Sequence, residues 1–85
     1  MRATLEKEYF MQFARSLSIE LKMHQLLWEQ SLEVFHVRSP EYRAICATGR
    51  KMQTLYIKQR EFAYQYLTEE EVDQCFTVTQ FCGFS

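Results

Sequence analysis

The side chains that could bind a metal ion or act as nucleophiles are two histidines and three cysteines, namely His24, His36, Cys46, Cys75 and Cys82. Zinc sites place such ligands in pairs separated by only a few residues. The chain has no Cys-x-x-Cys and no His-x-x-x-His pair, and the spacing from Cys75 to Cys82 fits no common zinc motif. We therefore expect no metal site and no cofactor.

Catalysis by Cys46 is the second chemistry that the residue types allow. Cys46 and His24 could meet across a helical hairpin, but no third group orients the histidine and no oxyanion hole can be assigned. The chain also lacks a glycine-rich phosphate loop. We predict that the protein is not an enzyme, that Cys46 is a buried thiol, and that His24 is a hydrogen-bonded core or interface residue.

The cysteine count and the N-terminal residues bear on the compartment. Three cysteines are an odd number without framework spacing, which indicates reduced thiols and a cytoplasmic protein. A Cys75–Cys82 disulfide in an oxidising compartment is the alternative. The segment MRATLEKEYF has charges where a signal peptide needs an apolar core, and no apolar run is long enough to span a bilayer. We expect no membrane association.

The chain has only two glycines and one proline, and two helix-start signals divide its 85 residues into three helical segments of one domain. Ser39-Pro40-Glu41 has the pattern of an N-cap, a proline in the first helical position and an acid in the first turn. Thr68 with Glu71 has the pattern of a capping box. We predict helices over about 4–36, 40–67 and 68–76, followed by a tail at 77–85. The alternation of apolar and polar residues over 76–81 favours an extended backbone at the start of that tail.

Apolar and small residues recur at heptad spacing in both long segments, which predicts an all-α fold built on a long antiparallel helical hairpin. The short third helix would fold an apolar edge over the open end of the hairpin, and a C-terminal tail would follow it. The first seam consists of Phe10, Ala14, Leu17, Leu21, His24, Trp28, Ser31 and Phe35. The second consists of Tyr42, Ile45, Gly49, Met52, Tyr56, Gln59, Ala63 and Tyr66.

A second apolar stripe lies on the opposite side of each long segment, and one neighbouring helix cannot cover both sides. On the first it includes Leu5, Tyr9 and Val37 besides the residues named below. Exposed apolar patches on small domains usually mark association sites. We predict a small non-enzymatic protein–protein interaction module, a regulator, inhibitor or adaptor, whose partner is another protein or a second copy in a homodimer. The predicted partner-binding residues are Ile19, Met23, Leu26, Leu27, Val34, Leu55, Phe62, Phe81 and Phe84.

Two alternatives remain open. A secretion-type chaperone would use the same surface chemistry and differ only in its partner. A nucleic-acid-binding protein would use a basic face of the second helix, formed by Arg43, Arg50, Lys51 and Lys58. The net charge of −1 and the presence of Glu61 in the same sector argue against nucleic acid, because its binders carry an excess of Lys and Arg.

Overall fold

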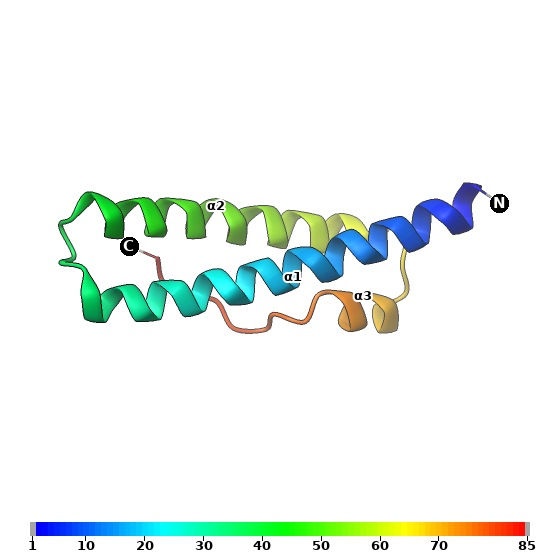
Figure 1. The fold of residues 1–85 in the computed structure, drawn as a ribbon. Coiled ribbons are helices and arrows are strands. Elements are labelled where there is room, and N and C mark those ends of the chain that lie inside the picture. Colours follow the sequence, from blue (N-terminus) through cyan, green and yellow to red (C-terminus); the bar gives the residue numbers. More distant parts are fainter. Residues whose placement is uncertain (1, 85) are drawn as a thin grey trace.

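A computed structural model describes the backbone of residues 2–84 and the side chains of residues 6–84. The described chain contains three helices, α1 (Arg2–Val34), α2 (Pro40–Ala63) and α3 (Glu69–Cys75), and no strand. Helices α1 and α2 form a long antiparallel hairpin (Figure 1). The predicted all-α fold, with its hairpin and short third helix, is therefore confirmed.

The heptad seams form the contact between α1 and α2. Ala14 and Leu21 of α1 are fully buried, as are Tyr56 and Ala63 of α2, and they belong to one continuous core cluster. The last predicted seam residue, Tyr66, is an exception because its side chain is 63% exposed. Helix α2 ends at Ala63, four residues earlier than predicted, and the chain then turns through hydrogen bonds from Gln65 and Tyr66 to the carbonyls three residues before them.

Both predicted helix starts are confirmed by hydrogen bonds. The Ser39 hydroxyl accepts from the Tyr42 amide at 3.2 Å, with Pro40 in the first turn of α2. Thr68 and Glu71 form the capping box of α3, because each side chain accepts from the other residue's amide, at 3.2 and 2.9 Å. Such caps satisfy amides that have no partner within the helix.

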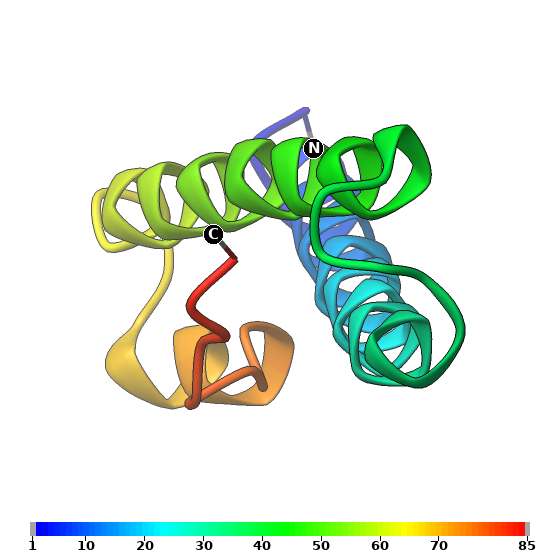
Figure 2. The ribbon, with the colours of Figure 1, turned by 90° about the vertical axis from the view of Figure 1, so that its left-hand side faces the viewer.

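The residues after α3 form an extended segment that returns along the hairpin (Figure 1). We call residues 76–84 the tail. It starts beside α3 and ends near the turn between α1 and α2, and Figure 2 shows α3 and the tail together on one side of the helix pair. Phe76 and Val78 are buried while Thr77 and Thr79 are exposed, which fits the extended backbone predicted for the start of the tail. Phe84, beyond the alternating residues, is also buried.

The molecule is elongated and thin. Its principal extents are 51 × 20 × 16 Å and its radius of gyration is 15.1 Å, against about 12 Å for a compact domain of this length. The two shorter extents leave room for little more than two packed helices, whose axes lie about 8–10 Å apart. Each long helix therefore keeps an uncovered side. None of the described helices is long and apolar enough to cross a membrane.

Candidate interaction surface

The outer face of α1 carries five of the predicted partner-binding residues. We call them the α1 stripe; their exposed fractions lie between 47% for Leu27 and 74% for Val34, and the set is Ile19, Met23, Leu26, Leu27 and Val34. The helical repeat places them opposite the buried seam of Ala14, Leu17 and Leu21. Val37 extends the stripe into the turn, whereas the side chain of Leu5 lies outside the described residues. All five residues of the stripe are exposed, as predicted.

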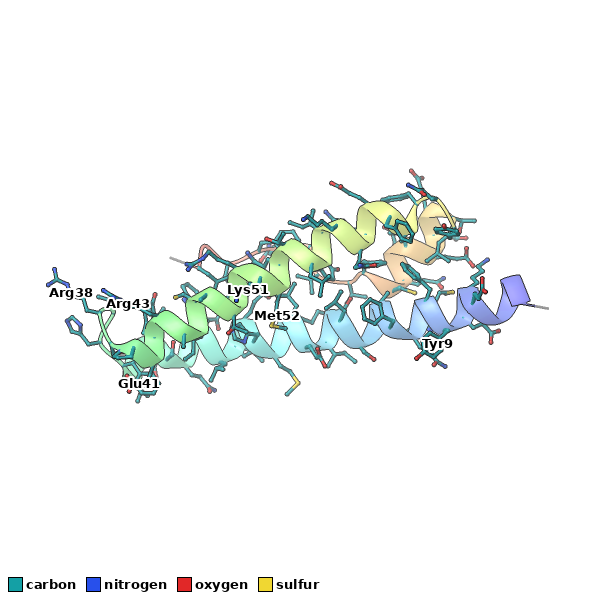
Figure 3. The ribbon with its side chains drawn as sticks, turned by 90° about the horizontal axis from the view of Figure 1, so that it is seen from above. Tyr9, Arg38, Glu41, Arg43, Lys51 and Met52 are labelled. Atoms are coloured by element: carbon teal, nitrogen blue, oxygen red, sulfur yellow. The ribbon has the colours of Figure 1, made fainter. Side chains whose placement is uncertain are left out.

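A second apolar surface lies where α1 and α2 face each other far from the turn. Leu55 and Phe62 of α2 are 43% and 45% exposed. The Phe62 ring packs on Phe10 of α1, with 6.2 Å between ring centroids, and on Tyr66 at 5.1 Å. A shallow depression of about 480 Å³ adjoins this cluster and is lined by Glu6, Tyr9, Phe10, Phe13 and Gln59. Figure 3 shows Tyr9 on α1 at this end of the molecule.

The two predicted anchors in the tail have different environments. Phe84 is only 5% exposed, so the prediction that it is available to a partner is wrong for this structure. Its ring lies against Trp28 and His24, at centroid distances of 5.5 and 5.7 Å, in a space left by Gly49 of α2. Phe81 is 37% exposed and packs edge-on against Tyr56, 5.8 Å between centroids.

The basic face of α2 is partly used by the fold itself. Arg50 donates a hydrogen bond from its guanidinium to the Phe84 carbonyl at 3.1 Å. Arg43, Lys51 and Lys58 are exposed. Figure 3 places Arg43 at the turn end of α2 and Lys51 farther along the helix. One of the four predicted cations thus holds the tail, and three face solvent.

The histidine and the cysteines occupy structural positions. The Ile45 carbonyl accepts a hydrogen bond from His24 Nε2 at 2.8 Å, which joins α1 to α2. Cys46 and Cys75 are buried, Cys82 is half-buried, and all three thiols are free. The extended tail separates Cys75 from Cys82, and they pack in different core clusters, so the alternative disulfide is not formed. Burial raises the pKa of the Cys75 and Cys82 thiols, which lowers their reactivity.

No group of three or more His, Cys, Asp and Glu side chains that could hold a metal ion occurs within the described residues. Electrostatic contacts are also few in that part of the chain. Lys7 of α1 forms an ion pair with Glu71 of α3 at 2.7 Å. Hydrogen bonds from Lys7 and from the Thr68 amide lower the pKa of the Glu71 carboxyl. This pair ties α3 to α1, and both side chains are partly exposed.

The sequence analysis did not identify the polar side chains that hold the tail. They come from both long helices and are Ser18, Gln25, Arg50, Gln53 and Tyr56. We call the space that they line, together with Gly49 and Trp28, the tail groove. Polar residues beside the apolar seams could have indicated this groove. An extended buried segment needs hydrogen-bond partners for its amides and carbonyls, and such residues can supply them.

Comparisons with known proteins give no assignment: no family model matches the chain, and no curated protein or solved structure was found to match it. The surfaces described above are therefore the basis for a functional argument. Among them, the α1 stripe is the largest set of exposed apolar side chains on a single helix face.

Proposed function

We propose that this protein is a non-enzymatic protein–protein interaction module, a regulator, inhibitor or adaptor that acts by packing the α1 stripe against a partner. The supporting observation is the exposure of five large apolar side chains on one helix face. They extend from Ile19 to Val34, which is about 22 Å at 1.5 Å per residue. A patch of this kind on a small domain is typical of an association site.

The spacing of the stripe suits a helical partner. Ile19, Met23, Leu26 and Leu27 follow one another at steps that keep them on one face, which is the pattern of helix-in-groove and helix-bundle contacts. Met23 adds an adaptable thioether side chain. Lys22 and Glu20 beside the stripe are exposed and of opposite charge, so the rim does not select a strongly charged surface.

A second copy of the chain is the partner that we propose first. The molecule is thin, and a small domain with a thin core gains stability when an apolar face is covered by a copy of itself. A twofold dimer would bring the same stripe from each copy together. The three free thiols support a cytoplasmic location for this protein.

The experiment compares two aspartate substitutions on the same helix. Leu26→Asp places a charge in the stripe, and Lys22→Asp places one on an exposed position beside it. We expect a dimeric solution mass for the wild type and for Lys22→Asp, and a monomeric mass for Leu26→Asp with its helical circular dichroism retained. A monomeric wild type would exclude the homodimer. Loss of helicity in Leu26→Asp would show that the stripe belongs to the core and would contradict the proposed function.

A further inference from the structure

The tail is held in its groove as a peptide ligand is held by a receptor. We propose that the tail groove is a peptide-binding groove, that the chain's own residues 76–84 are its displaceable occupant, and that it accepts in trans an extended peptide of the same chemistry. This chemistry is an apolar β-branched residue followed six positions later by an aromatic residue, as in Val78 and Phe84. The proposal does not depend on the α1 stripe.

The first half of the groove binds main-chain atoms of the tail. The Ser18 hydroxyl accepts from the Thr77 amide at 3.4 Å. The Tyr56 hydroxyl bonds both polar main-chain groups of Val78, because it accepts from the amide at 2.8 Å and donates to the carbonyl at 3.2 Å. One phenol therefore satisfies both the buried N–H and the buried carbonyl of Val78.

In the second half of the groove, side chains of α1 and α2 bind main-chain groups at every second residue of the tail. Gln25 donates to the Gln80 carbonyl at 3.1 Å, the Gln53 amide oxygen accepts from the Cys82 amide at 2.9 Å, and Arg50 donates to the Phe84 carbonyl at 3.1 Å. Between described residues, the segment 77–84 forms no hydrogen bond with another main-chain group. The groove thus binds atoms that every peptide possesses.

Selectivity would come from the side-chain pockets, as it does where extended peptides bind proteins through their main chain. Val78 is 3% exposed in the larger core cluster. Phe84 occupies the space above Gly49, where a Cβ atom would lie 2.5 Å from its ring. The glycine at this helix position therefore makes room for the Phe84 ring.

Two features make the tail displaceable. The side chains of Thr77, Thr79 and Gln80 face solvent and Gly83 has no side chain, so these residues contribute little apolar burial. Departure of residues 77–84 would break hydrogen bonds to side chains and expose Val78 and Phe84, but the hydrogen bonds within α1 and α2 would stay intact. Segments with few buried contacts open at lower free energy than the core around them.

The test uses the full chain with Phe84→Ala and a fluorescent synthetic peptide of residues 76–85, under reducing conditions. Fluorescence anisotropy should show that the peptide binds the variant at least about tenfold more tightly than the wild type, whose tail competes for the groove. A peptide with Ala in place of Phe84 should lose at least about tenfold in affinity. Adding Gly49→Val should abolish binding, while Ala44→Val, on an exposed position of the same helix, should not.

Hydrogen exchange of the wild type supplies a test that does not depend on any variant folding. The amides of Val78 and Cys82 should exchange through an opening that leaves the amides of α1 and α2 protected. Exchange of these two amides only with global unfolding would overturn the proposal. Failure of the peptide to bind a folded Phe84→Ala chain, or equal binding of the two peptides, would overturn it as well.

Discussion

Gly49 illustrates how a single residue can be unfavourable locally and favoured by its surroundings. It lies in the interior of α2, where glycine costs about 1 kcal/mol relative to alanine. The ring of Phe84 occupies the volume that any side chain at this position would need. The helix propensity lost at Gly49 is therefore offset by the burial of an aromatic ring from a segment 35 residues further along the chain.

In a double-mutant cycle on Gly49 and Phe84, the effect of Gly49→Ala on the free energy of unfolding should change sign with the residue at position 84. In the wild type we expect Gly49→Ala to destabilise by about 0–2 kcal/mol, because overpacking of about 1–3 kcal/mol exceeds the gain in helix propensity. In a Phe84→Ala chain the same substitution should stabilise by about 1 kcal/mol. Urea unfolding of the four proteins measures both effects. Equal effects in the two backgrounds would show that Phe84 does not occupy the space above Gly49 in solution.

The Lys7–Glu71 pair predicts a pH dependence. The pKa of Glu71 is below its ordinary value of 4.5, chiefly through the hydrogen bond from Lys7. Its contribution to stability is thus complete above the pKa of the unfolded chain and is lost as the pH falls through the lower pKa of the folded chain. Glu71→Gln keeps the capping acceptor and removes the charge. The difference in melting temperature between wild type and variant should be present at about pH 7 and vanish by about pH 2; a difference independent of pH contradicts this prediction.

Among the elements, the tail depends most on one side chain. The Tyr56 hydroxyl is the partner of both main-chain groups of Val78, and all three groups are buried. The Tyr56 ring also contacts Phe76 and Phe81 on the tail, at centroid distances of 5.4 and 5.8 Å. Tyr56 therefore couples α2 to the tail through both packing and hydrogen bonding.

Tyr56→Phe should destabilise the protein by about 1–3 kcal/mol, because it leaves a buried amide and a buried carbonyl without a partner while preserving the ring. The matched control is Tyr66→Phe, which removes a hydroxyl from a side chain that is 63% exposed. The control should leave the free energy of unfolding unchanged within about 0.5 kcal/mol. Chemical denaturation measures both variants, and similar effects for the two would show that the Val78 hydrogen bonds do not contribute.

The elements that the sequence predicted are those whose signals are local. Heptad spacing identified the buried faces of α1 and α2. Ser39 and Thr68 each marked a helix start through a pattern only a few residues long. The end of α2 at Ala63 was not predictable in this way, because neither Gly nor Pro follows it. The turn there is set by the burial of Leu67, which depends on the tertiary structure.

The candidate surfaces divide along the same line. Exposure of the α1 stripe followed from periodicity, since a helix with two apolar faces in a small domain must leave one uncovered. The burial of Phe84 could not be predicted from periodicity. It depends on the space that Gly49 leaves and on the hydrogen bonds that Gln53 and Arg50 form with the main chain of the tail. Spacing along one segment identifies its buried face but does not specify which distant segment covers that face.

At the scale of the whole molecule, one side of the hairpin is covered by α3 and the tail, and the other side is open (Figure 2). A molecule 51 Å long and 16 Å thick has room for association along its length, and the α1 stripe provides the apolar residues for it. The charged rim of the stripe is mixed, with Lys22 and Glu20 exposed beside it. Association through this face should therefore depend on apolar burial rather than on net charge.

This dependence predicts the response to salt. Raising the ionic strength from about 0.05 to about 0.5 M should leave the association constant of the wild type unchanged or strengthen it, because apolar contacts are not screened. Binding of nucleic acid through Arg43, Lys51 and Lys58 would instead weaken steeply over the same range. Sedimentation equilibrium at several salt concentrations measures the first quantity, and a steep loss of association would contradict packing through the stripe.

The distances along the chain between contacting residues also set an order of events during folding. The hydrogen bond between His24 and Ile45 joins residues 21 positions apart in the sequence. Those between Ser18 and Thr77 and between Gln25 and Gln80 join residues 59 and 55 positions apart. Closing the longer loops loses more chain entropy, and proteins tend to form local contacts first. The hairpin should therefore form before the tail docks. If folding follows this order, a competing peptide would meet the least resistance before residues 76–84 have docked.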